Sequence, residues 1–175
     1  VMTTRQVKPH SEQLLNEGLK VITVPDQRWD RCDIKSVSLL PNILGKQAAV
    51  EAGAYEAWQV DAEGMVTEGT STNAWIVTAD NKVVTRDATH SILNGITRIT
   101  LLELIRKEGY ELEERAFSVD EARAAREAFI TSSTSFVLPV TQLDGKPIGN
   151  GHPGILTGKL RRHYMDYMNG LRKTA

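Results

Sequence analysis

The sequence predicts a mixed α/β (α+β) domain, and three observations lead to that class. Runs rich in β-branched and aromatic residues alternate with short turn-forming segments, as in strands joined by tight loops. An apolar stripe of Ile99, Leu102 and Ile105 recurs at helical spacing. The chain has 175 residues, 41% of them hydrophobic, which is enough to bury one good core.

In the first half of the chain we expect one helix followed by three short strands. The helix covers residues 39–52, with Pro41 acceptable only in its first turn and Gly53 ending it. The strands are expected over residues 55–60, 74–78 and 82–85, separated by turns at 61–64 and 80–81.

The second half begins with a helix that starts at Thr97 and closes at Gly109. Ser118-Val-Asp-Glu121 reads as a capping box in front of an Ala-rich helix. Strands are expected over residues 111–117, 128–130 and 136–143.

The chain is expected to end in a hairpin and a helix. Asp144-Gly145 is a turn, and residues 144–149 are read as a hairpin rather than a phosphate loop. From Pro153 onward an amphipathic helix is predicted. Its candidate core residues are Ile155, Leu156, Leu160, Tyr164 and Met168.

Composition excludes several classes of function. A net charge of −1 gives no reason to expect nucleic acid or a membrane surface as a partner, and no apolar run approaches the ~18 residues of a membrane span. The single cysteine, Cys32, suits a reducing, cytoplasmic compartment and is read as a packed thiol rather than a nucleophile. The four histidines show no metal-ligand spacing, so no metal is expected.

Four short stretches offer a set of chemically useful groups. Residues 28–35 supply a lysine, residues 66–73 a carboxylate, and residues 94–98 and 131–135 small and hydroxyl side chains. A phosphorylated aldehyde cofactor such as pyridoxal phosphate needs an amine, a charged partner for its ring nitrogen and donors for its phosphate. The four stretches together supply these groups.

Lys35 is the candidate amine. If residues 29–36 are extended, Arg31, Asp33 and Lys35 share one face of a strand. A lysine on an inward face is costly unless it is paired or used covalently. The alternative is an ordinary solvated lysine.

Glu68 is the candidate carboxylate. Gly69 and the hydroxyl residues beside it let the backbone approach a ligand closely. A carboxylate beside a pyridine nitrogen keeps that nitrogen protonated, so that the ring can accept electron density. The alternative is a residue in a simple Glu-Gly turn.

Two segments are candidates for binding a phosphate. Residues 94–97 open the helix with its apolar stripe, where free backbone N–H groups and the helix dipole favour an anion, and Thr97 adds a hydroxyl. The alternative there is helix capping by Asn94 or Thr97. Five hydroxyl residues at 131–135 follow a predicted strand and form either a loop or a phosphate cradle.

Taken together, these stretches resemble the fold-type IV (class IV) pyridoxal-phosphate aminotransferases, over nearly the whole chain from about residue 26. Residues 28–36, with Leu-Leu-Pro-Asn-Ile-Leu at 39–44, resemble the D-amino-acid aminotransferase branch. Branched-chain aminotransferases usually carry an Asn-Tyr after a Gly-rich segment there. The resemblance implies a pseudo-barrel domain, in which helices flank a mixed sheet.

The resemblance also implies roles for individual residues toward pyridoxal 5'-phosphate. Lys35 matches the Schiff-base lysine and proton shuttle, and Glu68 matches the partner of the pyridine nitrogen. Leu93 matches a residue packed on the ring, and Arg28 an arginine near the phenolic oxygen. The phosphate-binding positions that it implies are Gly95, Ile96, Thr97, Ser132 and Ser133.

Members of this family have two domains. By resemblance, residues 1–25 are the end of a small N-terminal domain and the linker out of it, residues 26–175 form the large cofactor-binding domain, and the rest of the small domain is absent from this chain. In the family, the small domain supplies a phosphate-binding arginine, a tyrosine on the phenolic oxygen and most substrate-carboxylate contacts. We therefore expect the chain alone to be poorly active.

The implied function is transamination between an amino acid, such as D-alanine, and a 2-oxo acid, by a homodimer in the cytoplasm. Three related enzymes share the cofactor residues and remain alternatives: branched-chain aminotransferase, aminodeoxychorismate lyase and R-selective amine transaminase. A further alternative is an inactive truncated cofactor-binding domain that folds and dimerises without turnover.

Overall fold

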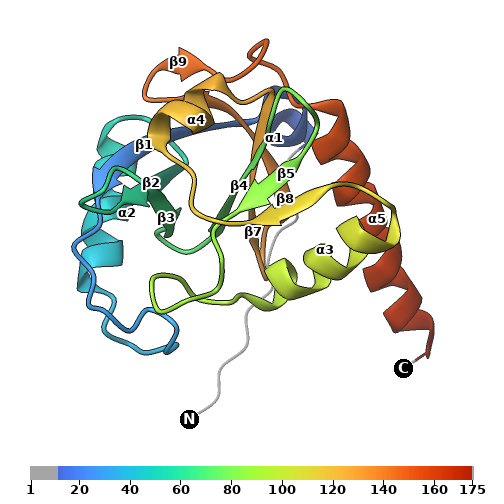
Figure 1. Ribbon diagram of the computed structural model, residues 1–175, viewed down its shortest axis with the longest axis horizontal. Helices are drawn as coiled ribbons and strands as arrows, with labels where there is room; N and C mark the ends of the chain where they lie inside the picture. Colours follow the sequence, from blue (N-terminus) through green and yellow to red (C-terminus); the bar gives the residue numbers. More distant parts are fainter. Residues whose placement is uncertain (1–11, 175) are drawn as a thin grey trace.

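The computed structural model describes residues 12–174, which form nine strands and five helices (Figure 1). The strands are β1 (Leu19–Pro25), β2 (Glu56–Val60), β3 (Val66–Gly69), β4 (Asn73–Val77), β5 (Val83–Thr85), β6 (Leu112–Glu114), β7 (Glu127–Ser132), β8 (Phe136–Leu143) and β9 (Lys146–Pro147). The helices are α1 (Glu12–Glu17), α2 (Leu40–Glu51), α3 (Ile96–Lys107), α4 (Val119–Ala124) and α5 (Ile155–Thr174).

All nine strands belong to one sheet that curls into a half-barrel, in the order β3-β2-β1-β8-β7-β4-β5-β6, with β9 on β8. β1 runs parallel to both β2 and β8, and β5 runs parallel to β6, whereas the other pairs are antiparallel. Because β1 and β2 are parallel and in register from Val21 to Pro25, their carboxyl ends meet at one edge. The backbone N–H of Asp26 donates to the carbonyl of Val60 at 2.7 Å, which starts the following loop at that edge.

The two faces of the sheet bury separate clusters of apolar side chains. On β4, Ala74 and Ile76 join the cluster inside the curl, while Trp75 and Val77 join the cluster on the outer face. This alternation is the period of two that a strand with both faces buried must show. On the outer face the Trp75 ring stacks on that of Phe129 with centroids 5.3 Å apart, an arrangement that adds to their area burial.

Helices α3 and α5 cover the outer face, pack against each other and lie together beside β7 and β8 (Figure 1). The start of α5 is anchored by the buried carboxylate of Glu127, which accepts from the backbone N–H groups of Leu156 at 3.1 Å and Thr157 at 2.8 Å. A side chain at Gly154 would collide with that carboxylate, so the close approach requires glycine. Helix α2 packs on β2 and β1 instead.

Most elements predicted from the sequence are confirmed. Helix α2 carries Pro41 in its first turn and is followed by Gly53 in the left-handed region at φ +67°. β2, β4, β5, β7 and β8 match their predicted strands to within a few residues. Asp144-Gly145 forms the predicted turn between β8 and β9, and α3 ends before Gly109 as expected.

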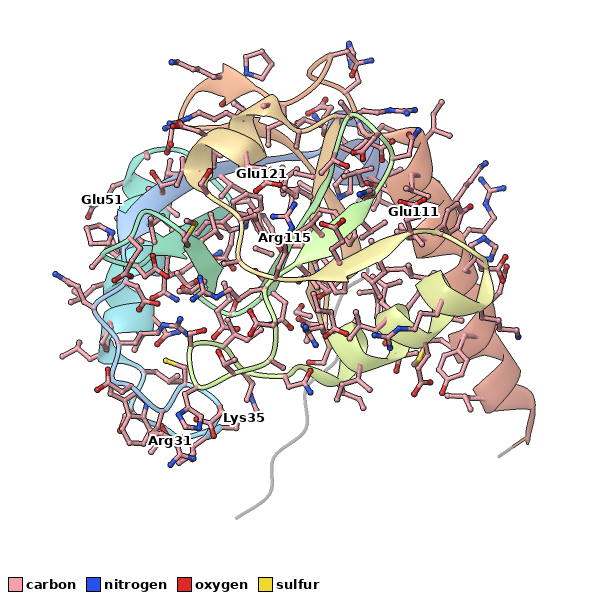
Figure 2. The ribbon with its side chains drawn as sticks, in the orientation of Figure 1. Arg31, Lys35, Glu51, Glu111, Arg115 and Glu121 are labelled. Atoms are coloured by element: carbon pink, nitrogen blue, oxygen red, sulfur yellow. The ribbon has the colours of Figure 1, made fainter. Side chains whose placement is uncertain are left out.

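Half of the predicted capping box is present. Ser118 caps α4 by accepting from the backbone N–H of Glu121 at 3.0 Å. The carboxylate of Glu121 does not return the bond but pairs with Arg115, near the middle of the view in Figure 2.

Two strands were not predicted, and one of them bears on the domain division. β3 has only four residues, and β1 lies between β2 and β8 near the middle of the sheet. Residues 1–25 were expected to form an upstream domain and linker, but Leu19–Pro25 belongs to the same sheet as the rest of the chain. Residues 1–11 lie outside the described part, and the proposed division there stays a prediction.

The expected strand over residues 29–36 is wrong. These residues form part of an irregular loop from Asp26 to Leu39, with a turn at Cys32 and Asp33. The alternating charges that suggested a strand face satisfy each other locally, because Arg31 pairs with Asp33 at 2.8 Å.

Three smaller expectations also need correction. Ile99 is 37% exposed and Ile155 is 71% exposed, so neither belongs to the core, and Leu101 is buried instead. β6 covers only Leu112–Glu114 of the longer strand expected there. The thiol of Cys32 is partly exposed on the loop and donates to the carbonyl of Trp29 at 3.1 Å.

Candidate active site

The carboxylate of Glu68, at the end of β3, lies at the centre of a dense set of hydrogen bonds. Its side chain is 9% exposed and forms an ion pair with Arg28. The backbone N–H of Leu93 donates to both carboxylate oxygens, at 3.1 and 3.2 Å, and the side-chain amide of Asn73 donates at 3.0 Å. A buried carboxylate is stable only with such donors.

Arg28 connects this carboxylate to the loop after β1. Its guanidinium is 5% exposed and pairs with Asp26 at 2.7 Å as well as with Glu68. It also donates to the hydroxyl of Thr67 at 3.1 Å and to the carbonyl of Ser91 at 3.0 Å. One side chain thus joins the ends of β1 and β3 to the segment after β5.

The two carboxylates beside Arg28 differ in acidity. Burial raises the pKa of Glu68 to about 7, because the loss of hydration outweighs the lowering by Arg28 and by the Leu93 N–H. Burial also raises the pKa of Asp26, but the hydrogen bonds and charge of Arg28, with the hydroxyl of Thr67, outweigh that effect and leave it below the usual range. Of these two carboxylates, Glu68 is therefore the one whose protonation is sensitive to a nearby charge at neutral pH.

The predicted anion site at the start of α3 lies next to this set of hydrogen bonds. α3 begins at Ile96 after Gly95, and no side chain of a described residue caps it. A Cβ atom at Gly95 would lie 2.6 Å from the side-chain oxygen of Asn73, so only glycine fits there. Capping by Asn94 is wrong, since its side-chain oxygen accepts from Arg98 at 2.9 Å.

The second predicted phosphate segment, residues 131–135, begins beside Asn73 because β4 pairs with β7. Asn73, the first residue of β4, is paired with Thr131 of β7, and Ser132 follows it. Ser132 stabilises the β7–β8 turn by accepting from the N–H of Ser135 at 3.0 Å, while Ser133 is exposed on the turn. The start of β4 and the β7–β8 turn therefore lie at the same edge of the sheet.

The structure does not bring Lys35 into contact with the other predicted residues. It is exposed on the loop before α2, at the same end of the molecule as Arg31 (Figure 2). Its amine forms no hydrogen bond or ion pair with any residue that the structure describes. The loop is tied to the segment after β5 because the N–H of Cys32 donates to the carbonyl of His90 at 2.8 Å.

Sequence reasoning missed three residues of the site: Asp26, Thr67 and Asn73. All three are polar residues next to or within short strands, and that position is the only signal in the sequence that could have singled them out. A cleft of about 750 Å³ opens on the loop side of Arg28. Its lining includes Asp26, Arg28, Trp29, Thr67, Arg86 and His90.

Two further structural tests limit the classes of site. No group of acidic, histidine or cysteine side chains among residues 12–174 could hold a metal ion. None of the helices in that range has the length and apolar composition needed to cross a bilayer.

The half-barrel sheet holds a buried carboxylate beside a helix start that no described side chain caps. The chain belongs to the class IV aminotransferase family, whose sequence model matches residues 1–143. The resemblance seen in the sequence is thereby confirmed.

Individual relatives agree with the family. The chain is 49% identical over 150 residues to a D-alanine aminotransferase of Bacillus licheniformis, covering 86% of this chain and 52% of that protein. It is 40% identical over 158 residues to a D-alanine aminotransferase of Listeria monocytogenes, covering 90% and 54%. The chain thus spans about half the length of the curated relatives it matches.

Solved structures share the fold. The T.th. branched-chain amino acid aminotransferase with pyridoxamine 5'-phosphate superimposes with a TM-score of 0.85 at 29% identity, over 94% of this chain and 55% of that one. The branched-chain aminotransferase of Thermobaculum terrenum in its PLP form gives a TM-score of 0.81 at 28% identity, over 93% and 54%.

Proposed function

We propose that the chain carries the cofactor-binding part of a pyridoxal 5'-phosphate-dependent aminotransferase that moves an amino group between a D-amino acid and a 2-oxo acid. The observation that carries the proposal is the continuous set of contacts from the Glu68 carboxylate, through Asn73 and Leu93, to the uncapped start of α3. This set of contacts connects a carboxylate that can pair with a ring nitrogen to a helix start that can bind an anion. The names of the relatives at 49% and 40% identity favour a D-amino acid such as D-alanine.

The residues present fit this cofactor. At the start of α3, Gly95 has no Cβ, which would collide with the side-chain oxygen of Asn73, and the first-turn N–H groups have no side-chain cap. The Glu68 carboxyl, with a pKa of about 7, gains its charged form when a pyridinium approaches it, since an opposite charge favours ionisation. The phosphate would be held by Gly95, Ile96, Thr97, Ser132 and Ser133.

The remaining roles follow from the same residues. When bound, pyridoxal 5'-phosphate supplies an aldehyde that takes an amino group and a ring that accepts electron density. Lys35 would supply the amine that holds the cofactor and would move a proton at the substrate α-carbon. Leu93 would pack on the ring, Arg28 would lie near the phenolic oxygen, and Glu68 would hold the proton on the ring nitrogen.

We also propose that the enzyme is a cytoplasmic homodimer. Support comes from α2, where Leu40, Ile43 and Leu44 expose more than half of their surface next to one another on one helix. Contiguous exposed apolar side chains of this kind mark interaction surfaces.

The proposal is tested by adding pyridoxal 5'-phosphate to the chain, recording the absorbance of the bound cofactor, reducing with borohydride and mapping the labelled peptide. We expect label on Lys35, its loss in Lys35→Ala, and its retention in Lys82→Ala, a control lysine paired with Glu113. Label on Lys46 or Lys82 in the wild-type chain would overturn the assignment.

Substrate class is tested on the cofactor-loaded chain before any reduction with borohydride. D-Alanine should change the absorbance of the bound cofactor in a single half-reaction, with 2-oxoglutarate reversing the change. A response to L-leucine without one to D-alanine would instead favour the branched-chain aminotransferases that the solved structures are named for.

A further inference from the structure

Asn73 is a buried polar side chain of the site, and the proposed reaction gives it no direct part. It is the first residue of β4 and is 5% exposed. Its side-chain nitrogen donates to the carboxylate of Glu68 at 3.0 Å and to the carbonyl of Leu93 at 2.8 Å. A side-chain amide nitrogen has two N–H groups, so the two bonds use its full donor capacity.

The same side chain also touches the phosphate end. Its oxygen lies 2.6 Å from where a Cβ of Gly95 would be, directly at the start of α3. Its backbone pairs with Thr131, the residue before Ser132 and Ser133. One residue therefore contacts the carboxylate, the segment that carries Leu93 and the first residue before the helix.

We propose that Asn73 is a positioning residue that fixes the spacing between the ring end of the site at Glu68 and the phosphate end at Gly95. This inference rests on the proposed function. The Leu93 carbonyl that Asn73 binds is two residues before Gly95, so the amide ties the helix start to the strand that carries Glu68.

The chemistry of an amide suits this role better than related side chains. Aspartate has the same shape but cannot donate, and it would place a second negative charge beside Glu68. Serine has one donor and so can serve only one of the two partners. Alanine leaves both the carboxylate and the carbonyl without the donor they now have, which is costly at buried positions.

A spacing role makes a distinctive prediction about ligands. A ligand that engages both ends benefits from their fixed separation, because its second contact is effectively intramolecular. A ligand that engages one end gains nothing from it. Pyridoxal 5'-phosphate spans both ends, and inorganic phosphate engages only the start of α3 and the β7–β8 turn.

The test compares Asn73→Ala and Asn73→Ser with Asn42→Ala, each by equilibrium binding of pyridoxal 5'-phosphate and of inorganic phosphate. Asn42 is a matched control, because its amide makes one bond, to the carbonyl of Thr70 at 2.9 Å, and none to Glu68. We expect Asn73→Ala to bind pyridoxal 5'-phosphate roughly 10- to 100-fold more weakly, as for one hydrogen bond to a charged group. Asn73→Ser should lose less, and inorganic phosphate should change by less than about twofold in every variant.

An equal loss for both ligands would overturn the inference, since it would show a general structural role, and so would unchanged binding of pyridoxal 5'-phosphate. A second measurement needs no cofactor. The amide NMR signal of Leu93, whose N–H contacts Glu68, should titrate with a pKa of about 7 in the wild-type chain and at a higher pH in both Asn73 variants. An unshifted titration would also overturn the inference. If the wild-type chain binds no pyridoxal 5'-phosphate, the proposed function is overturned instead, and the titration of the Leu93 signal still tests the role of Asn73.

Discussion

The carboxylate end of the site and the loop that carries Lys35 are held in opposite ways. Glu68 is buried at the end of a strand and receives bonds from Arg28, Asn73 and the Leu93 N–H. Lys35 is exposed on an irregular segment and forms no bond with a described residue. In the proposed function, the sheet would preorganise the groups that hold a ring and a phosphate, while the amine would come from an exposed loop.

The two arginines of that loop show the same contrast within a few residues. Arg28 is 5% exposed and bridges Asp26 to Glu68, whereas Arg31 is 47% exposed and pairs with Asp33 alone among the described residues. A buried ion pair is hydrated poorly and depends on both partners, but an exposed pair is screened by water. Only the first of the two arginines contributes to the architecture of the site.

The largest expected effect is therefore that of Arg28→Ala, which leaves the carboxylates of Asp26 and Glu68 without their cation. We expect the free energy of unfolding to fall by about 3–5 kcal/mol, as for removing one partner of a buried ion pair. Arg31→Ala should lower it far less, because water screens the exposed pair. Urea denaturation of both variants measures the difference. Similar losses of unfolding free energy in the two would show that the buried pair stabilises the fold no more than the exposed pair does.

A smaller effect is expected from pH. The pKa of Glu68 is about 7 in the folded chain and 4.5 as its ordinary value, so the folded state binds more protons between these values. The stabilising contribution of Glu68 is fully present below pH 4.5 and is lost as the pH rises through about 7. Relative to Glu68→Gln, the free energy of unfolding of the wild-type chain should fall by up to about 3 kcal/mol across this range.

The measurement is urea denaturation of both proteins at several pH values, with the difference between them taken at each pH. Taking the difference cancels the pH dependence that comes from histidines and other groups present in both proteins. Parallel pH profiles would mean that Glu68 titrates as an ordinary carboxyl and that burial does not raise its pKa.

The smallest expected effect is that of Lys35→Ala on stability. An exposed side chain without partners contributes little, so the free energy of unfolding should change by less than about 0.5 kcal/mol. Thermal or urea denaturation checks this in the variant made for the borohydride experiment. A loss of several kcal/mol would show that the lysine loop is held by contacts of its side chain and would remove the distinction between the two ends of the site.

Several features of the fold could be predicted because they depend on neighbours in the chain. The helix with Pro41 near its start and Gly53 behind it follows from the fixed φ of proline and the tolerance of glycine for positive φ. The β8–β9 turn follows from Asp144-Gly145 for the same kind of reason. Caps, turns and periodicity are local, so a single sequence reports them.

The elements that were missed have the opposite character. β3 is four residues long and includes Thr67 and Glu68, which are buried although polar, so no apolar alternation marks it. The segment around Lys35 shows alternating charges, but Arg31 and Asp33 satisfy each other within a turn instead of lining a strand. In β3 the partners that bury Glu68 come from other parts of the chain, whereas at residues 29–36 an ion pair within the segment replaces the strand.

By itself the sequence determined the mixed α/β class, most of the elements and the family, together with the residue types that a cofactor needs. Only the tertiary structure decided which of those residues meet. Glu68, Asn73 and Leu93 come from different strands and loops, and their hydrogen bonds exist because strand register and the packing of the segment before α3 bring them within about 3 Å of one another. Contacts between distant parts of the chain depend on all the packing between them, which no local pattern encodes.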